Sequence, residues 1–419
     1  MTPGVRPPRL AVVFDFGSAT PMSILAAARG LAEVVFLCDR GLPHVRPLYD
    51  DLRALARVCD ITGLTDEQIL AHPDCAGLAG IVTFSESRIN RTAALAARLG
   101  LPSLGVDTAA AVTDKYRQRC LFAETGVQHT PCRVVRARSE LGPALAEVGL
   151  PAVLKPRSGA ASARTCTVHD VGEAHARWDE FAGGPAEFVV EALLAGDPSV
   201  AGPGWGDYVS VESVISYGDI AHVEVTGKFP LAAPLRETGY VVPGTLDDSH
   251  RREVLALTTA ALTALGVRHG VTHTEVKLTP DGPRIIEVNG RLGGYVADLV
   301  RRARGFDLVR AALTVALGRT PARPPAALRR HTFQYFLTPP MTAVALRRLD
   351  GTDRLDDIPG IHLVELFAQP GTTLDWRRGT LAHLGIVHGS ARDHQGVQRL
   401  VEEVGRALDI EYEESPEAG

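Results

Sequence analysis

THTEVKLTPDGPRIIEVNGRLGG, residues 272–294, has the pattern of two antiparallel strands joined by a tight turn. On both sides of residues 279–283, polar and apolar side chains alternate with period two. Such alternation is typical of strands with one buried face and one polar face. We therefore predict a β-hairpin whose turn is centred on Asp281.

Two carboxylates are expected to meet across this hairpin. A turn with that centre pairs Val276 with Ile286. It also places Glu275 opposite Glu287. Like charges directly opposed across strands are destabilising unless something compensates, and a hard divalent cation with oxygen ligands is the simplest compensation. Asn289 is expected on the same face. The alternative is a solvated sheet face with unpaired acids, and a register slip of one residue would also break this geometry.

Arg291 lies in the stretch GRLGG that follows the hairpin. A guanidinium beside two metal-binding carboxylates suits a phosphoryl group under attack, because it offers planar, paired donors to developing negative charge. Gly293 and Gly294 allow backbone and ligand to come close. The alternative is a salt bridge from Arg291 to Glu275 or Glu287.

Lys155 follows the apolar strand AVLK and precedes the loop PRSGAASAR, which contains Ser158. The backbone N–H groups of such small residues can approach phosphate oxygens closely, and a lysine there neutralises phosphate charge. The order GxxxxGK[ST] is absent, so this is not a P-loop. The alternative is an ordinary surface lysine at the end of a strand.

A further strand, EFVVE, ends at Glu191 and runs into ALLAGD. This is a connector of the kind that binds the edge of an adenine through backbone groups. Asp197 and Asp207 bracket a Gly/Pro-rich insert, and either can accept hydrogen bonds from ribose hydroxyls. The alternative for both is a turn aspartate.

Composition excludes several classes of protein. The chain has 419 residues, 45% of them apolar, which is enough for two or three domains. It has 44 basic against 49 acidic residues, unlike a nucleic-acid-binding protein. The apolar runs are too short for a bilayer and the amino terminus lacks a signal-peptide pattern, so we expect no membrane association and a cytoplasmic location. Six cysteines without CxxC pairs argue against disulfides and zinc.

The two ends of the chain differ in pattern from its middle part. Residues 1–110 alternate strands and helices, as in RLAVVFDF, TPMSILAAARGL and AEVVFLCD, which predicts a parallel α/β layer. The stretch DFGSAT does not match GxGxxG, so a dinucleotide site is not supported. After about residue 320 the Pro-rich stretch RTPARPPAALRRH leads into a strand-rich tail.

The blocks DKYRQR, VLKPRSGAAS, FVVEALLAGD, YVSVES, THTEVKL and IIEVNGRLGG occur in an order that resembles the ATP-grasp superfamily, and more closely its bacterial L-amino-acid ligases. The resemblance covers roughly residues 1–320, and the E-x-N-x-R block is its most specific part. It implies an α/β fold with an N-terminal domain at 1–110 and an ATP-grasp domain at 111–320. It also implies a small lid lobe at about 123–193, a larger antiparallel-sheet lobe with ATP between the two, and an α+β C-terminal domain at 321–419.

The resemblance also implies roles for single residues. Lys115, Lys155 and Ser158 are expected at the phosphates of ATP, and Glu191, Leu194 and Asp197 or Asp207 at its adenosine. Glu275, Glu287 and Asn289 are expected to hold Mg²⁺, for which Mn²⁺ can substitute, and Arg291 to contact the transferred phosphate. His222, Glu237, His273, Gly293 and Gly294 are expected near the substrates, although His273 and Glu237 have structural alternatives as a strand histidine and a loop acid.

The activity implied by the resemblance is ligation of a small carboxylate to an amine, with an amino acid joined to a second amino acid or to another amine. The reaction is expected to pass through an acyl phosphate and to release ADP and phosphate. One rival keeps the fold but activates bicarbonate, as in carboxylase-like or purine-pathway enzymes. The other is a non-catalytic ATP-binding module, although binding alone needs fewer charged groups. The sequence does not fix the substrates or the oligomeric state, for which a homodimer is one option.

Overall fold

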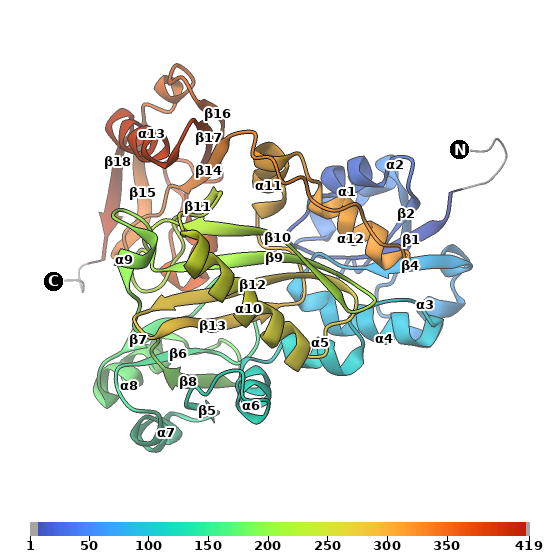
Figure 1. Ribbon diagram of the computed structural model, residues 1–419, viewed down its shortest axis with the longest axis horizontal. Helices are drawn as coiled ribbons and strands as arrows, with labels where there is room; N and C mark the ends of the chain where they lie inside the picture. Colours follow the sequence, from blue (N-terminus) through green and yellow to red (C-terminus); the bar gives the residue numbers. More distant parts are fainter. Residues whose placement is uncertain (1–6, 416–419) are drawn as a thin grey trace.

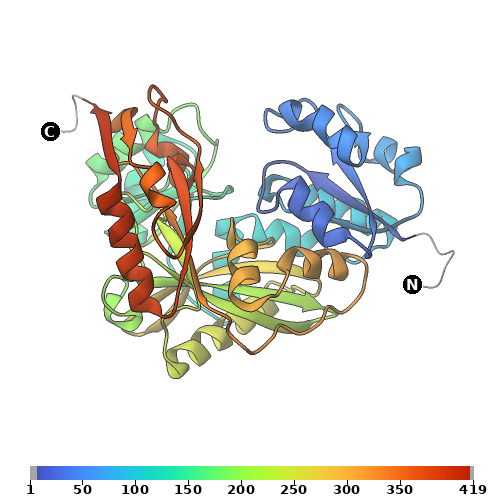
Figure 2. The same cartoon turned by 90° about the horizontal axis from the view of Figure 1, so that it is seen from above.

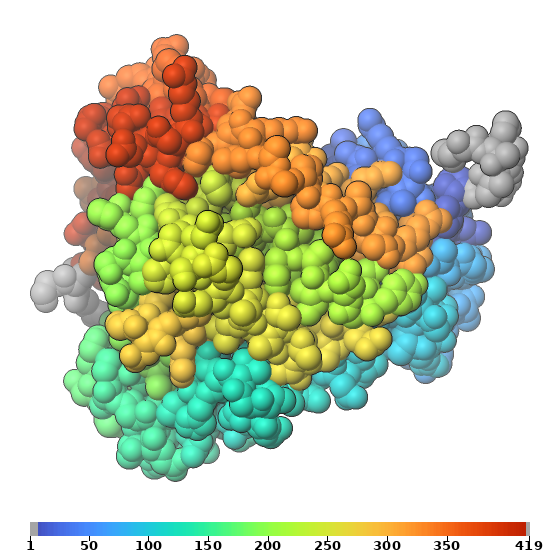
Figure 3. Space-filling model, in the orientation of Figure 1, coloured from blue at the N-terminus to red at the C-terminus, as the bar shows by residue number. Residues whose placement is uncertain are grey.

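The computed structural model describes residues 7–415 of the chain. An N-terminal layer, a lid lobe and a C-terminal region surround a large antiparallel sheet (Figure 1). The N-terminal layer (blue) and the C-terminal region (red) stand at opposite ends of that sheet (Figure 2). On the surface, the lid lobe (teal and green) forms the lower side of the molecule (Figure 3). Within residues 7–415, the helices are too short or too polar to cross a membrane.

The N-terminal layer is a parallel sheet with strand order β3-β2-β1-β4. Its strands are β1 (Arg9–Phe14), β2 (Glu33–Cys38), β3 (Arg57–Asp60) and β4 (Leu78–Val82). Its helices are α1 (Pro21–Ala28), α2 (Tyr49–Leu55), α3 (Asp66–Ala71) and α4 (Ile89–Leu99). These helices bury both faces of the sheet, which explains why β1, β2 and β4 are largely apolar. The predicted parallel α/β layer is confirmed.

The lid lobe is built on an antiparallel sheet with strand order β5-β8-β6-β7. Its strands are β5 (Cys132–Val135), β6 (Ala152–Pro156), β7 (Cys166–Val168) and β8 (Phe188–Ala192). Helices α7 (Leu141–Val148) and α8 (Val171–Glu180) pack against one face of this sheet. Helices α5 (Val106–Val112) and α6 (Lys115–Glu124) connect the N-terminal layer to the lobe.

The central sheet has eight antiparallel strands in the order β13-β12-β9-β10-β11-β14-β17-β16. Five of them precede residue 300: β9 (Tyr208–Ser216), β10 (Asp219–Lys228), β11 (Gly239–Val242), β12 (Gly270–Thr279) and β13 (Gly282–Asn289). Helix α10 (Asp248–Ala264) covers one face, and α11 (Val296–Arg304) and α12 (Leu308–Ala316) pack on the other. The short helix α9 (Pro198–Ala201) precedes β9.

The C-terminal region continues the central sheet. It supplies the remaining three strands, β14 (His331–Phe336), β16 (Ile361–Leu366) and β17 (Gly385–Ala391). A separate pair, β15 (Ala343–Asp350) and β18 (Asp409–Glu414), and helix α13 (His394–Ala407) complete it. The 3₁₀ turns of the chain are η1 (Arg46–Leu48), η2 (Pro73–Cys75), η3 (Glu86–Arg88), η4 (Arg138–Glu140), η5 (Asp353–Leu355) and η6 (Trp376–Ala382). Strands β14, β16 and β17 lie in the same sheet as strands from before residue 320, so the sheet extends across the predicted domain boundary. That boundary remains a prediction.

The hairpin of β12 and β13 pairs Glu275 with Glu287, as predicted. Its turn is shorter than predicted, because Thr279 already pairs with Gly282. The predicted pairing of Val276 with Ile286 is wrong, since Val276 pairs with Ile285. A β-bulge adds one residue to β13 between Ile285 and Glu287, and this extra residue restores the opposed carboxylates.

Candidate active site

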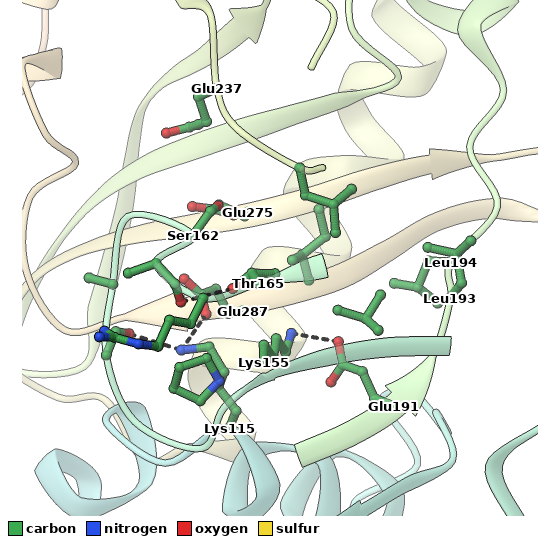
Figure 4. Close-up of a pocket in the computed structure, with 18 of the residues that line it drawn as sticks. Lys115, Lys155, Ser162, Thr165, Glu191, Leu193, Leu194, Glu237, Glu275 and Glu287 are labelled. Atoms are coloured by element: carbon green, nitrogen blue, oxygen red, sulfur yellow. Dashed lines mark hydrogen bonds and ion pairs between the residues drawn. The ribbon is translucent and has the colours of Figure 1, made fainter. Parts of the chain in front are cut away.

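A cavity of about 210 Å³ lies between the lid lobe and the central sheet. Eight residues singled out from the sequence line it: Lys115, Lys155, Ser158, Glu191, Leu194, Glu237, Glu275 and Glu287. Figure 4 shows Leu193 and Leu194 at one side, Glu275 and Glu287 at the other, and Glu237 beyond Glu275. The cavity therefore has an apolar end, a charged middle and a second polar end.

The carboxylate pair lies in the middle of the cavity. Lys115 Nζ is 3.1 Å from Glu287 Oε2 and donates to the Gly159 carbonyl oxygen at 2.9 Å. Burial opposes ionisation of Glu287, but the charges of Lys115 and Lys155 outweigh it and lower its pKa to about 2. An ionised carboxylate opposite a second one, on a shared cavity wall, is a donor set that would suit a hard divalent cation such as Mg²⁺.

Asn289 lies on the same face as Glu287, as predicted, but outside the cavity wall. Its Nδ2 donates to Glu287 Oε1 at 3.2 Å, and its Oδ1 accepts from Arg291 Nη2 at 3.2 Å. Arg291 also lies outside the wall, and its Nε is 2.8 Å from Glu86 Oε2 in η3. The alternative of a salt bridge to Glu275 or Glu287 is wrong, because Arg291 pairs with the N-terminal layer.

Lys155 belongs to a buried ion cluster under the cavity floor. Its Nζ lies 2.5 Å from Glu191 Oε1, and Arg119 holds both oxygens of the same carboxylate at 3.0 and 3.1 Å. Burial opposes ionisation of Glu191, but the charges of Arg119 and Lys155 lower its pKa to about 2. Only 5% of Lys155 is exposed, so the alternative of an ordinary surface lysine is wrong.

Arg119 was missed from the sequence, although it lies four residues after Lys115 and therefore on the same side of α6. It donates to the carbonyl oxygens of Ile285 and Ile286 at 3.0 and 2.6 Å. These carbonyls belong to the bulge of β13, where ladder bonds are interrupted. Arg119 thus joins the bulge that aligns the glutamates to the carboxylate of Glu191.

The two candidate ribose acids have different surroundings. Asp197 caps α9, where its Oδ1 accepts from the backbone N–H and hydroxyl of Ser199 at 2.9 and 2.6 Å. Neither Asp197 nor Asp207 lines the cavity itself. Asp207 Oδ1 accepts from Lys277 Nζ at 2.7 Å, and Lys277 is part of the cavity wall. Of the two acids that the sequence left open, the geometry favours Asp207, because it bonds a residue of the cavity wall.

Glu237 forms the far wall of the cavity. Lys228 Nζ, which is fully buried, donates to Glu237 Oε1 at 2.7 Å. The Tyr240 hydroxyl donates to Oε2 of the same carboxylate at 2.6 Å. These two donors fix the carboxylate in a position where it faces the cavity (Figure 4).

His273 lies beside the carboxylate pair. Its Nδ1 is 2.8 Å from Glu212 Oε1 and its Nε2 is 3.5 Å from Glu275 Oε1. Burial lowers its pKa, but the charge of Glu212 outweighs burial and raises it to about 9. Gly293 abuts the His273 ring, where an added Cβ would lie 2.5 Å from Nδ1, whereas an added Cβ at Gly294 has no neighbour within 4 Å. None of these three residues lines the cavity.

The structure does not bring His222 to the cavity. Its ring lies against α10, with Nδ1 2.9 Å from the Ser213 hydroxyl and Nε2 2.8 Å from the Thr259 hydroxyl. The resemblance implied that the stretch containing His222 and Glu237 borders the substrates. Side chains on a strand point to alternate faces, so nearness in sequence does not select the cavity face.

A model of the ATP-grasp domain matches residues 148–298. Alanine–anticapsin ligase of Bacillus amyloliquefaciens is 28% identical over 59% of this chain and 56% of that protein. Carnosine synthase 1 of Gallus gallus is 32% identical over 42% of this chain and 20% of that protein. The chain spans about half the length of the Bacillus relatives that it matches.

One solved structure can be superimposed on almost the whole chain. It is an L-amino acid ligase from Bacillus licheniformis, which covers 98% of this chain and 100% of its own length. Its TM-score is 0.77 at 20% sequence identity. At this identity the similarity is one of fold.

Proposed function

We propose that this chain, which contains an ATP-grasp domain and has the ATP-grasp fold, is an ATP-dependent carboxylate–amine ligase. The observation that carries the proposal is the opposed pair Glu275 and Glu287, which shares one cavity with Lys115 and Lys155. The two carboxylates suit a divalent cation, and the two ammonium groups suit the negative phosphates of a nucleoside triphosphate that accompanies it.

The proposed position of ATP follows the length of the cavity. The adenine lies against Leu193 and Leu194, and the ribose lies near Asp207. The phosphates lie under the loop of residues 158–165, named the cover loop below, with Lys115 and Lys155 beside them. Glu275 and Glu287 hold Mg²⁺, or Mn²⁺ in its place, and the cation supplies charge neutralisation to the phosphates when bound. Asn289 would become a third ligand of the cation after its Oδ1 releases the hydrogen bond from Arg291.

In the proposed reaction a substrate carboxylate oxygen attacks the γ-phosphorus of ATP. The bond from that phosphorus to the bridging oxygen breaks, which gives an acyl phosphate and ADP. The amine nitrogen then attacks the acyl carbon, inorganic phosphate leaves, and the amine gives up one proton. Lys155 stabilises the charge that develops on the transferred group, since phosphoryl transfer depends on positioning and electrostatics. Arg291 contributes to this only after its guanidinium leaves Glu86 and turns toward the cavity.

The proposed acceptor end is the wall formed by Glu237. A carboxylate there is suited to an ammonium group, and the named activities of the two curated relatives are an alanine ligase and a carnosine synthase. They support amino acids as substrates. We therefore propose that the chain joins an amino acid to a second amino acid or to another amine.

The proposed reaction releases ADP and inorganic phosphate. The full chain, given ATP, Mg²⁺ and pairs of amino acids, is expected to form ADP and phosphate in equal amounts with the amide product. Nucleotide chromatography and a phosphate assay measure this. Formation of AMP and pyrophosphate contradicts the proposal. ADP formation that responds to bicarbonate and not to amino acids favours the carboxylase-like rival.

Asp207→Asn is expected to raise the KM for ATP about tenfold, because a carboxylate that accepts a ribose hydrogen bond contributes about this much. Asp197→Asn is the matched control, and its KM is expected to stay unchanged because Asp197 caps α9. Repeating the assay with 2′-deoxy-ATP and 3′-deoxy-ATP identifies the hydroxyl. If Asp207→Asn loses the same affinity for all three nucleotides, Asp207 does not contact the ribose.

The cytoplasm is the compartment that we propose. All six cysteines are free thiols, and five of them are buried. Thiols in this state are typical of a reducing compartment.

A further inference from the structure

The cover loop holds an unusual backbone. Ala161, Ser162 and Arg164 have φ values of 59°, 52° and 49°. None of them is glycine, and the left-handed region costs other L-residues of the order of 1–2 kcal/mol each. Such conformations persist only where surrounding contacts impose them. The cover loop therefore needs an outside support in the conformation that closes the cavity.

The support comes from the C-terminal region, more than 200 residues later in the chain. The Thr380 N–H donates to the Ala161 carbonyl oxygen at 2.8 Å, and the Arg164 N–H donates to the Arg377 carbonyl oxygen at 2.9 Å. Gly379 has φ 64° and ψ −136° between these bonds. An added Cβ there would lie 2.1 Å from the Ala161 oxygen, so only glycine allows this approach.

The same segment of η6 is anchored on the lid lobe itself. The Trp376 ring lies 5.9 Å from the Phe181 ring, and the Arg177 guanidinium lies 5.6 Å from the Trp376 ring centre. Residues 376–380, named the clamp segment, thus contact both the body of the lid and its cover loop. Figure 2 shows the C-terminal region beside the lid lobe.

The clamp segment also reaches the other end of the cavity. The Glu237 N–H donates to the Thr380 hydroxyl oxygen at 3.3 Å. Lys228 and Tyr240 hold the carboxylate of Glu237, and Thr380 holds the backbone of the same residue. Thr380 therefore contacts the cover loop through its N–H and the acceptor wall through its hydroxyl.

We propose that Gly379 and Thr380 are positioning residues that hold the cover loop closed and couple its closure to the acceptor wall at Glu237. The inference rests on the proposed function, because it assigns nucleotide to the cover loop and amine to Glu237. Thr380 forms one hydrogen bond to Ala161 in the cover loop and a separate one to the backbone of Glu237. Closing over nucleotide then orders the acceptor wall before the amine binds.

Gly379→Ala tests the hold on the cover loop. Hydrogen exchange of the full chain is measured by mass spectrometry, with and without Mg²⁺ and the non-hydrolysable analogue AMP-PNP. Amides of residues 158–165 are expected to exchange about tenfold faster, and AMP-PNP to bind about tenfold more weakly, because the two bonds to the loop are lost. Gly371→Ala is the matched control, since Gly371 also has positive φ in the C-terminal region but an added Cβ there meets no atom within 4 Å.

Thr380→Val tests the coupling. It keeps the N–H bond to Ala161 and removes the hydroxyl that accepts from Glu237. AMP-PNP is expected to protect residues 231–238 from exchange in the wild-type chain. In Thr380→Val it should still protect residues 158–165 but no longer residues 231–238. Thr380→Ser restores the hydroxyl and is expected to restore the protection.

Each outcome decides one claim. Equal exchange in Gly379→Ala and Gly371→Ala overturns the hold, and this comparison also works without nucleotide. Protection of residues 231–238 that survives in Thr380→Val overturns the coupling. A wild-type chain that does not bind AMP-PNP overturns the proposed function instead, while the nucleotide-free exchange of Gly379→Ala still decides the hold.

Discussion

Replacing Glu287 by alanine is expected to lower the rate of ATP-dependent ligation by roughly a thousandfold or more, the effect of losing several kcal/mol of charge stabilisation. The Glu287 carboxylate is ionised, with a pKa of about 2, and lies opposite Glu275 in the middle of the cavity. Without it, the proposed divalent cation would keep one protein carboxylate, and Lys115 loses the partner that holds its ammonium group at 3.1 Å.

The fold is expected to tolerate Glu287→Ala. The substitution removes one of two directly opposed negative charges, and Lys115 keeps its bond to the Gly159 carbonyl oxygen. ADP formation over a titration of Mg²⁺ measures the loss, and circular dichroism measures the fold. Arg284→Ala on the same strand is the control, because Arg284 bonds the His129 carbonyl oxygen outside the cavity. Wild-type turnover of Glu287→Ala at saturating Mg²⁺ contradicts the role.

The period-two alternation of residues 272–294 was enough to predict the hairpin and the opposition of Glu275 and Glu287. It was not enough to predict the bulge. The bulge depends on α6, which supplies donors from Arg119 and Gln118 to carbonyl oxygens of β13. Contacts from a helix about 170 residues earlier in the chain leave no trace in the pattern of the hairpin itself.

Other features depended on tertiary contacts in the same way. Asp197 and Asp207 are equivalent in the sequence, and only the folding of α9 gives Asp197 its capping bonds. The strands of the C-terminal region were expected. Their place in the sheet, where β14 pairs with β11 and β17 pairs with β14, depends on long-range contacts that the local pattern of a short strand does not determine. The clamp segment was missed for the same reason, because Gly379 becomes informative only when Ala161 lies beside it.

Replacing Glu191 by alanine is expected to lower the free energy of unfolding by about 3–5 kcal/mol, the usual cost of removing one partner from a buried ion cluster. Glu191 accepts from Lys155 and from two nitrogens of Arg119, and all three side chains are buried. Arg119 and Lys155 then lose their direct partner in the interior and keep only the more distant charge of Glu287. The bulge is expected to loosen as well, since Arg119 also bonds the Ile285 carbonyl oxygen.

Urea unfolding of the full chain at pH 7 measures the loss, and Glu187→Ala is the matched control. Glu187 lies directly before the same strand and pairs with Arg136 and Arg157 at the surface, where screening leaves an ion pair little net effect. Little change is therefore expected from it. A loss in Glu191→Ala no larger than in Glu187→Ala would show that the buried cluster adds nothing to stability.

The pH dependence of stability gives an independent check on the same carboxylate. Its pKa in the folded chain is lowered from 4.5 to about 2. A lowered pKa stabilises the folded state above the unfolded value, and this contribution disappears as the pH falls through the folded value. The wild-type chain should therefore lose more stability than Glu191→Ala between about pH 4.5 and pH 2. Parallel curves for the two proteins over this window would mean that Glu191 is not held as an ion by Arg119 and Lys155.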